Sequence, residues 1–478
     1  MKKTKIICTM GPNTENPEIL KALIREGMDI ARFNFSHGSH EEHKAKLDLL
    51  KKIREEMNIP VAAMLDTRGP EIRTGLLTDG RPVELTEGGE YTLTTKELTG
   101  NSSIGYINYS GLAEDVAPGD CLLIDDGLIR LTVIEKNETD IRCRIDNGGT
   151  LGEHKGVNAP GVEIRLPDLT DQDKEDIAFG IDQDMDFIAA SFVRSADCIR
   201  SIRKILNAFG SRMKIIAKIE NQQGVDHNDE IISEADGIMV ARGDMGVEIA
   251  PEQVPYIQKE IIRKCNECCK PVITATQMLD SMIRNPRPTR AEVGDVANAI
   301  YDGTDAIMLS GETAMGKYPV EAVRMMADIA KSTESHLSQD LYQQRHLTKN
   351  KSNVTNMVCY SSVSVATTIK ARAILAPTMS GFTARMLSKW RPEVEVIGLT
   401  PNEKVLRQMQ LYWGVRPLKV KWQNSTDDLI RLCLKQTESV LPLKKGDHVV
   451  ITAGVVNEPG DSFRSASNTN MMRVVTAE

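Results

Sequence analysis

The amino-acid sequence predicts an α/β fold: a (β/α)8 TIM barrel with an inserted small β domain and a C-terminal α/β domain. Short apolar runs alternate with amphipathic helical patterns before Pro70, and this alternation resumes after Pro167. The stretch between them is rich in Thr, Val, Leu and Gly and reads as β structure. Three predicted strands precede the stretch and five follow it, and eight parallel strands covered by helices are typical of a closed barrel.

The first part of the barrel can be assigned element by element. Strands are predicted at 5–9, 29–33 and 61–65, and helices at 17–26 and 39–57. Asn16 followed by Pro17 is typical of a helix cap and the first helical position. Ser39 stands three residues before Glu42, which is the spacing of a capping box, so the second helix should begin there.

The inserted stretch, 70–167, should form a β domain of its own. The runs 130–134 and 141–145 flank a turn as the arms of a hairpin do. Its two connections, near Pro70 and Pro167, suit a hinged lid. Beyond it, strands are predicted at 187–190, 214–219, 237–241, 271–274 and 306–309. Helical patterns lie at 197–209, 224–234, 252–269, 289–301 and 319–334.

The rest of the chain predicts a third unit. Residues 1–69 and 168–342 form the barrel, the polar segment 343–353 a linker, and residues 354–478 the C-terminal α/β domain. Strands of this last domain are predicted at 373–376, 395–399, 415–420 and 447–452, and helices at 363–371, 383–390, 403–409 and 427–437.

Composition excludes several classes of protein. Hydrophobic residues make up 41% of the 478 residues and charged residues 26%, which is the globular norm. A net charge of −8 and an aromatic content of 4% argue against a nucleic-acid partner or an anionic membrane surface. No apolar run approaches the roughly 18 residues of a membrane-spanning helix. Nine cysteines cannot all pair, so we expect a reducing, cytoplasmic location.

Polar side chains follow the predicted barrel strands at their carboxyl ends, where the functional groups of such barrels lie. Arg32, Asn34 and Ser36 alternate, so they share one face of the extended chain. Lys218 and Glu220 do the same after a later strand. Charges that point into a barrel mouth need partners, because one unpaired buried charge costs several kcal/mol. The pattern therefore predicts a functional site at this rim.

These residue types favour phosphoryl or enolate chemistry. Glu220 and Asp244 could hold one Mg²⁺, leaving its other positions to water and substrate oxygens. Lys218 beside them is a point charge that can follow a transferring phosphoryl group, and Arg32 and Arg73 offer fork-shaped donors. Oxygen ligands that could hold a monovalent cation are Asn34, Ser36, Asp66 and the Thr67 carbonyl.

The chain resembles the pyruvate kinase family in several long motifs that occur in order along it. They are TKIICTMGP at 4–12, ARFNFSHG at 31–38, DTRGPEIR at 66–73, IIAKIEN at 215–221, ARGD at 241–244, ITATQML at 273–279 and NPRPTRAE at 285–292. The resemblance covers essentially the whole chain, in the bacterial layout without an N-terminal extension. Arg68, Gln223 and Met245 depart from residues that are common in the family, and none of these changes removes a charged role.

This resemblance implies the last step of glycolysis, in which the phosphoryl group of phosphoenolpyruvate passes to ADP to give pyruvate and ATP. Lys218 would stabilise the phosphoryl group in flight, Arg32 would bind it, and Thr276 would assist protonation of the enolate. The implied substrate contacts are Arg32, Gly243, Asp244 and Thr276, and the implied nucleotide contacts are Arg73, Lys155, Asn34 and His37. The implied ligands are Glu220 and Asp244 for Mg²⁺ (or Mn²⁺), and Asn34, Ser36, Asp66 and Thr67 for K⁺.

The resemblance also implies regulation and assembly. Relatives of this kind are homotetramers, and a phosphorylated allosteric effector is expected at Thr378, Ser380, Gly381 and Thr383, which lie between a strand and a helix. The family carries glutamate or lysine at the position of Glu71, and glutamate accompanies dependence on K⁺.

Two other functions remain open from the residues alone. A barrel lyase or aldolase acting on pyruvate-like enolates would share the Mg²⁺ site but would not need Arg73 or Lys155. A sugar-phosphate sensor without catalysis would not need Lys218 and Thr276 together. Cys265, Cys268 and Cys269 resemble metal-site spacing but should lie on a helix without a second pair.

Overall fold

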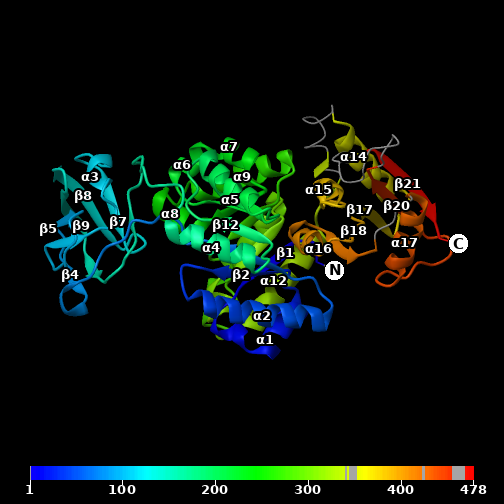
Figure 1. Ribbon diagram of the computed structural model, residues 1–478, viewed down its shortest axis with the longest axis horizontal. Helices are drawn as coiled ribbons and strands as arrows, with labels where there is room; N and C mark the ends of the chain where they lie inside the picture. Colours follow the sequence, from blue (N-terminus) through cyan, green and yellow to red (C-terminus); the bar gives the residue numbers. More distant parts are fainter. Residues whose placement is uncertain (1, 340–341, 344–352, 422–425, 455–468, 478) are drawn as a thin grey trace.

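The computed structural model describes residues 2–339, 342–343, 353–421, 426–454 and 469–477. Figure 1 shows three bodies in a row: the inserted domain, the barrel and the C-terminal domain. Most of the predicted linker falls outside the described residues. No helix in the described part of the chain is long and apolar enough to cross a membrane.

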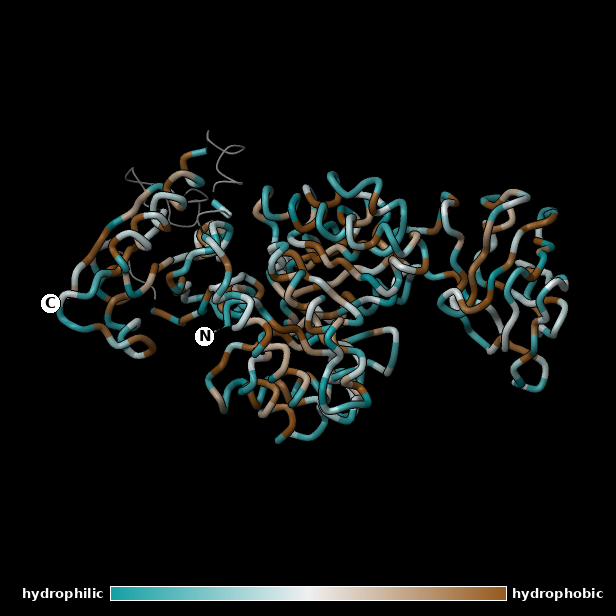
Figure 2. Tube along the Cα trace, turned by 180° about the vertical axis from the view of Figure 1, so that it is seen from behind, coloured by the Kyte–Doolittle hydropathy of each residue, from teal (hydrophilic) through white to brown (hydrophobic). Residues whose placement is uncertain are grey.

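The middle body is a closed barrel of eight parallel strands, as predicted. The strands are β1 (Lys5–Thr9), β2 (Ile30–Asn34), β3 (Ala62–Asp66), β12 (Phe187–Ala190), β13 (Lys214–Ile219), β14 (Gly237–Ala241), β15 (Val272–Ala275) and β16 (Ala306–Leu309). Their side chains are almost all buried, and Figure 2 shows these apolar segments at the centre of the molecule. β12 pairs with β3, so the chain leaves the barrel for the inserted domain and returns to the neighbouring strand position.

The helices cover the barrel with their apolar faces inward. They are α1 (Pro17–Glu26), α2 (His40–Met57), α4 (Asp171–Asp182), α5 (Ala196–Ala208), α6 (Gln222–Asp226), α7 (Asn228–Glu234), α8 (Arg242–Glu248), α9 (Val254–Cys268), α10 (Arg290–Asp302), α11 (Gly311–Ala314) and α12 (Pro319–Glu334). The capping box of Ser39 with Glu42 is confirmed, since each side chain bonds the other's backbone N–H. The helix predicted at 224–234 is wrong as one element: His227 separates α6 from α7.

The inserted domain is a β domain, as predicted. Its strands are β4 (Val83–Leu85), β5 (Glu90–Thr94), β6 (Ile104–Tyr106), β7 (Cys121–Ile124), β8 (Ile129–Lys136), β9 (Asp140–Asn147), β10 (Gly149–Leu151) and β11 (Val157–Asn158), with one short helix, α3 (Leu112–Asp115). The predicted hairpin is the β8–β9 pair. The domain has its own apolar core, which separates it from the barrel core.

The C-terminal domain is a five-stranded sheet with helices on it. Its elements are α14 (Val354–Thr368), β17 (Ala373–Pro377), α15 (Phe382–Ser388), β18 (Glu395–Thr400), α16 (Glu403–Gln408), β19 (Val415–Lys419), α17 (Thr426–Glu438), β20 (His448–Ala453) and β21 (Met471–Thr476). The first helix begins earlier than the predicted 363–371, because Asn353 caps it at Thr355. β21 was not predicted; it pairs antiparallel with β20.

Buried polar contacts join the C-terminal domain to the amino end of the barrel. Arg391 pairs with Asp305 just before β16 at 2.7 Å, and Arg407 pairs with Asp186 just before β12 at 2.8 Å. Lys5 on β1 donates to the carbonyl of Val415 at 2.7 Å. The two domains therefore share an interface in which these three cations are matched by acceptors, at the opposite end of the barrel from the predicted site.

Candidate active site

Four of the predicted residues meet at the carboxyl end of the barrel. The Nζ atom of Lys218, on β13, lies 3.1 Å from Oδ1 of Asp66 and 2.9 Å from Oε1 of Glu220. The Nε atom of Arg32, on β2, donates to Oδ2 of Asp66 at 2.5 Å. All four side chains are at least nine-tenths buried. The rim therefore holds a compact network of two cations and two carboxylates.

Burial and charge act in opposite directions in this network. Burial disfavours the charge on Lys218, but Asp66 and Glu220 outweigh it and raise the pKa of Lys218 above its ordinary value. Burial also opposes ionisation of Asp66, yet Arg32 and Lys218 hold its pKa below the ordinary value. Burial raises the pKa of Glu220 to about 7, with Lys218 opposing the rise and Asp244 adding to it. Lys218 thus stays cationic, whereas Glu220 ionises only near neutral pH and a further cation would stabilise its carboxylate form.

Ser191 belongs to this network and was missed by sequence reasoning. Its Oγ atom receives a hydrogen bond from Lys218 Nζ at 2.7 Å and donates to the Thr67 carbonyl at 2.6 Å. Ser191 is the first residue after β12, so its position at a strand end was an available signal. The next residue, Phe192, donates its N–H to Oε2 of Glu220 at 2.6 Å and has a φ of 53°.

Thr276 is held at the end of β15 by the first residues of α8, which directly follows β14. Its Oγ1 accepts from the N–H of Gly243 at 2.7 Å and donates to the carbonyl of Ala275 at 2.6 Å. Arg242 donates to the Thr276 carbonyl at 2.7 Å and pairs with Asp295. Thr276 has a φ of 69°, a conformation that is uncommon for a β-branched residue. The structure therefore fixes this hydroxyl at some cost in backbone strain.

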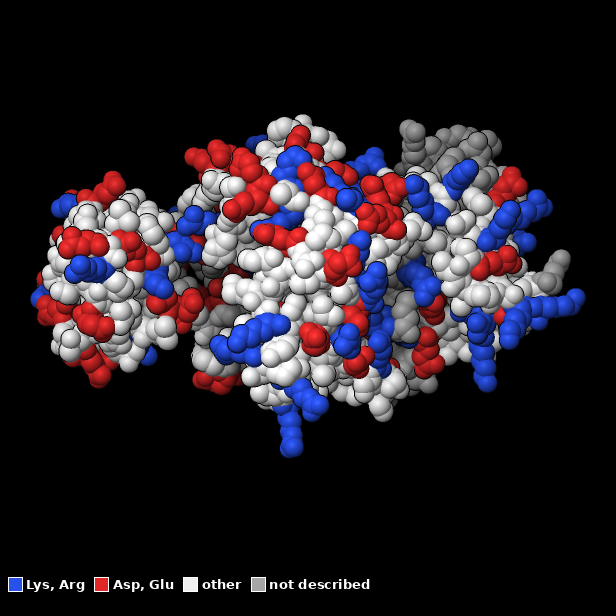
Figure 3. Space-filling view, turned by 90° about the horizontal axis from the view of Figure 1, so that it is seen from below, with Lys and Arg blue, Asp and Glu red and all other residues white. Residues whose placement is uncertain are grey.

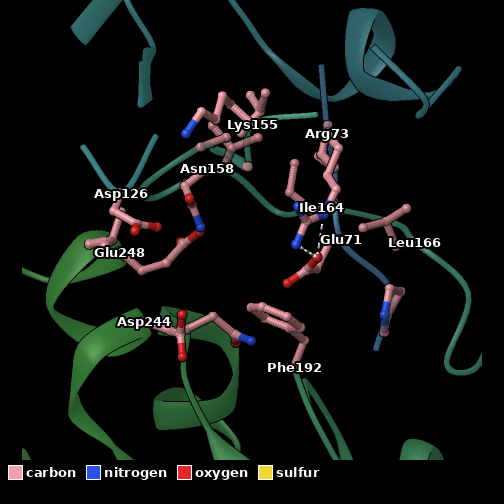
Figure 4. Close-up of a pocket in the computed structure, with 18 of the residues that line it drawn as sticks. Glu71, Arg73, Asp126, Lys155, Asn158, Ile164, Leu166, Phe192, Asp244 and Glu248 are labelled. Atoms are coloured by element: carbon pink, nitrogen blue, oxygen red, sulfur yellow. Dashed lines mark hydrogen bonds and ion pairs between the residues drawn. The ribbon is translucent and has the colours of Figure 1, made fainter. Parts of the chain in front are cut away.

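A cleft of about 360 Å³ lies between the rim and the inserted domain. Arg73 and Lys155 line it from the inserted domain, and Asp244 from the barrel, as Figure 4 shows. Both cations already have partners: Arg73 bonds Glu71 at 2.5 Å and Lys155 bonds Asp125 at 3.0 Å. Arg32, Lys218 and Glu220 do not line this cleft but lie deeper in the barrel mouth. The cleft is suited to a polyanion, which would replace Glu71 as the partner of Arg73 and Asp125 as the partner of Lys155.

A contact across the cleft joins the inserted domain to the barrel. Asn158 of β11 donates to Oε1 of Glu248 at the end of α8 at 2.8 Å. Burial raises the pKa of Glu248 above its ordinary value. Asp126, on the same wall as Lys155, has a pKa raised by burial and by the nearby charge of Asp244. Neither Glu248 nor Asp126 was singled out from the sequence.

The predicted monovalent-cation ligands lie next to the network. Asn34 ends β2, and its side-chain oxygen accepts the N–H of Ser36 at 3.2 Å. Asp66 ends β3, and the Thr67 carbonyl follows it. His37 is exposed, and its carbonyl lies 2.9 Å from Nε2 of the buried His43, which holds this loop in place. These hard oxygen donors suit K⁺ in type.

Glu220 is the residue that best indicates whether the site suits a metal ion. Its Oε1 atom is buried and accepts no hydrogen bond of good geometry, although Lys218 lies 2.9 Å away. Asp244 is close enough to raise the pKa of Glu220. Among the described residues no cluster of three or more His, Cys, Asp or Glu could enclose a metal. Two carboxylates that leave the other positions to substrate and water fit Mg²⁺ rather than a closed zinc site.

The candidate effector residues are brought together only in part. Ser380 is exposed, and Gly381, with a φ of 79°, caps the short helix α15. Thr378 is half-buried, and its N–H donates to the carbonyl of Leu399. The Oγ1 atom of Thr383 is buried, 2.9 Å from Oγ1 of Thr469, so it is engaged inside the domain. Ser380 is thus the hydroxyl of this loop that is best placed to meet a ligand.

The chain is similar to known proteins over its whole length. The family model described as "Pyruvate kinase, barrel domain" matches residues 1–323, and "Pyruvate kinase, alpha/beta domain" matches residues 356–475. A pyruvate kinase of Clostridium acetobutylicum is 48% identical over 480 residues, with 100% of both chains covered. One of Staphylococcus epidermidis is 49% identical, covering 99% of this chain and 80% of the relative. The crystal structure of a pyruvate kinase from Cryptosporidium parvum has a TM-score of 0.93 and 39% identity, covering 99% of this chain and 96% of that one.

Proposed function

Because the chain belongs to the pyruvate kinase family, whose members are phosphotransferases, we propose that it moves the phosphoryl group of phosphoenolpyruvate to ADP. The products are pyruvate and ATP. The observation that carries this proposal is the buried position of Lys218 between Asp66 and Glu220, at the barrel mouth below a cleft lined by Arg73 and Lys155.

The substrate phosphate binds in reach of Arg32 and Lys218. Asp66 orients both cations, since it accepts from Arg32 and from Lys218 through different oxygens. As the phosphoryl group leaves the enolate oxygen, negative charge spreads over its oxygens, and the fixed ammonium of Lys218 stabilises that charge without reorganisation. Arg73 and Lys155 bind the nucleotide phosphates by exchanging their present partners, Glu71 and Asp125.

Thr276 then acts on the enolate that remains. Its hydroxyl is oriented by Gly243 and Ala275, so its proton and lone pairs have defined directions. It directs the protonation of the enolate carbon through a water molecule. Gly243 presents its N–H at the same place, and Asp244 follows it.

Glu220 and Asp244 would hold Mg²⁺ (or Mn²⁺), which supplies charge neutralisation for phosphate and enolate oxygens when bound. Asn34, Ser36, Asp66 and the Thr67 carbonyl would hold K⁺. Asn34 and His37 would also contact the nucleotide, as the resemblance implies. In each case the support is the donor type and the position of the residue at the rim.

Regulation and assembly complete the proposal. Apolar side chains on the barrel helices are exposed, among them Tyr256, Tyr301 and Met315, at 68%, 52% and 71%. Such exposure supports self-association, and we propose a homotetramer. A phosphorylated effector binds the loop around Ser380 together with Thr378, Gly381 and Thr383. All nine cysteines are free thiols, which supports a cytoplasmic location.

A coupled assay of pyruvate formation tests the reaction. Pyruvate should appear only when phosphoenolpyruvate, ADP and Mg²⁺ are all present, and more rapidly with K⁺. The lyase or aldolase alternative predicts instead a metal-dependent carbon–carbon cleavage that needs no ADP. The sensor alternative predicts ligand binding without turnover. Either result in place of nucleotide-dependent pyruvate release would overturn the proposal.

A further inference from the structure

A hollow at the junction of the barrel and the C-terminal domain collects four cationic side chains. Lys270 comes from the barrel, between α9 and β15, and Arg385, Lys389 and Arg391 come from α15 and the residues after it. On the face drawn in Figure 3, Lys and Arg side chains, with some Asp and Glu beside them, line the boundary between these two domains. The hollow has a volume of about 20 Å³, compared with about 360 Å³ for the cleft, so it can admit only a small ligand group.

The charges in this hollow are not balanced. The one carboxylate among its lining residues, that of Asp305, forms an ion pair with Arg391, with 2.7 Å between Nη1 and Oδ1. The structure gives Lys270, Arg385 and Lys389 no carboxylate partner among the residues it describes. This differs from Arg407 and Arg391 at the same junction, each of which meets an aspartate. Partly buried cations that line one hollow without a carboxylate partner cost free energy, so an anion would be stabilised here.

The unused donors point to the kind of anion. Arg385 has a buried Nε atom with no hydrogen-bond partner. Lys389 is 7% exposed and donates to one carbonyl, that of Glu267, which leaves two of its three N–H groups. Lys270 donates to the carbonyls of Ser233 and Ala235, which leaves one. A guanidinium fork and two ammonium groups match a tetrahedral oxyanion.

Burial lowers the pKa values of two of these groups. Burial, and then the charge of Arg385, hold the pKa of Lys270 below its ordinary value. Burial does the same to the pKa of Lys389. A bound anion would reverse both effects.

We propose that this hollow is a binding site for a phosphate-type oxyanion, held by Arg385 and Lys389 of the C-terminal domain and by Lys270 of the barrel. The site is separate from the cleft and from the loop around Ser380, which lies at the other end of α15. Because its ligands come from two domains, a bound oxyanion ties the domains together. The class includes free phosphate and the phosphoryl end of a larger molecule.

Cys269 provides a local probe, because its thiol lines the hollow while that of Cys268 is exposed on the helix. Its Sγ lies 3.6 Å from the carbonyl oxygen of Arg385. Alkylation of the full chain by iodoacetamide is followed at each cysteine by peptide mass spectrometry. Inorganic phosphate should slow the reaction of Cys269 about tenfold at ten times its dissociation constant, relative to chloride at equal ionic strength. The reaction of Cys268 should not change.

Substitutions test which residues are responsible for the protection of Cys269 by phosphate. Protection of Cys269 should be lost in Arg385→Met with Lys389→Met and kept in Arg431→Met, which removes an arginine that is 81% exposed on α17. Arg385→Gln alone should weaken it if the double variant does not fold. Ser380→Ala should keep it. Repeating the measurement with a nucleoside monophosphate separates free phosphate from a larger ligand. Equal rates in phosphate and chloride, protection that survives loss of the cations, or protection abolished by Ser380→Ala would each overturn the proposal.

Discussion

The Nζ atom of Lys218 lies 2.9 Å from Oε1 of Glu220, and both side chains are buried at the barrel mouth. Replacing Lys218 by Met removes the cation that faces the transferring phosphoryl group. The rate should fall by roughly a thousandfold, on the order of 3–5 kcal/mol, while phosphoenolpyruvate binding is largely kept. Lys214→Met, on the same strand but at its other end, is the matched control and should retain activity. Near-normal turnover by Lys218→Met would remove Lys218 from the mechanism.

The hydrogen bond from Asn158 to Glu248 ties the inserted domain to the barrel. We predict that this domain closes over the nucleotide, because water in the cleft would compete as phosphoryl acceptor. X-ray scattering should show a smaller radius of gyration with ADP, Mg²⁺ and a substrate analogue than without them. Asn158→Ala should make the position of the inserted domain more variable in the ligand-free protein, and this should broaden the scattering profile. One unchanging domain angle in all conditions would contradict the idea.

Activation by a phosphorylated effector should depend on the loop before α15. Ser380→Ala with Thr383→Ala should abolish activation by sugar phosphates or nucleoside monophosphates in the coupled assay, without changing the basal rate. Thr383 contacts Thr469 inside the domain, so Thr383→Ser, which keeps the hydroxyl, is the control for packing. Full activation of the double alanine variant would place the effector elsewhere.

We predict that Glu71 determines the response of the enzyme to K⁺. It forms an ion pair with Arg73 at 2.5 Å, so it cancels a cation that would otherwise face the nucleotide. Close like charges among substrates and carboxylates cost a few kcal/mol at an effective dielectric constant of about 20, so a bound cation must offset them. We predict strong activation by K⁺, weaker activation by Na⁺, and a Glu71→Lys variant that keeps some activity without K⁺. Glu71→Gln separates loss of the carboxylate from gain of the ammonium. A wild-type enzyme that is fully active in tetramethylammonium buffer would refute this.

Lys5 should make the free energy of unfolding depend on pH in the alkaline range. Burial lowers its pKa to about 8, with Asp29 opposing the shift. Below pH 8 both folded and unfolded chains carry the proton, so the burial cost is fully present. Between pH 8 and 10.5 the folded chain has released the proton while the unfolded chain keeps it, so stability rises with pH. Relative to Lys5→Met, wild type should gain about 3 kcal/mol across this window, measured as the difference in thermal unfolding. A pH-independent difference would show that burial does not lower the pKa of Lys5 in the folded chain.

The barrel could be predicted closely because its strands are short apolar runs bounded by turn residues. Phe187–Ala190 and Lys214–Ile219 have the predicted limits, since each contains a short run of buried apolar residues. Helix α4 was missed, because its sequence is rich in acidic residues and its apolar period is weak. β21 was missed as well: it lies at the edge of the sheet, and most of its side chains are only partly buried or exposed.

The site could be predicted where a charged residue follows a strand, as at Lys218 and Glu220. Ser191 is uncharged, and a serine after a strand is not a distinctive sequence signal. Only the folded structure shows that it lies between Lys218 and the Thr67 carbonyl. The pairing of Arg73 with Glu71 was likewise not predicted, because it depends on side-chain direction two residues apart on an irregular segment. The cationic hollow could not be predicted either, since it joins residues that are distant in sequence.

The pairing of β3 with β12 has a consequence for how the chain reaches its native state. The two strands adjoin, and the N–H of Gly69, where the chain leaves the barrel, donates at 2.9 Å to Oδ1 of Asp173, where the chain has returned, so the excursion begins and ends close together. Loop-closure entropy grows only logarithmically, at about 0.6 kcal/mol for each doubling of length, so a melted insertion adds little to the cost of forming this pair. The inserted domain has its own core and can fold or melt as a separate cooperative unit. Formation of the barrel therefore does not depend on whether the inserted domain is folded. The chain can tolerate large changes in the inserted domain without losing the barrel.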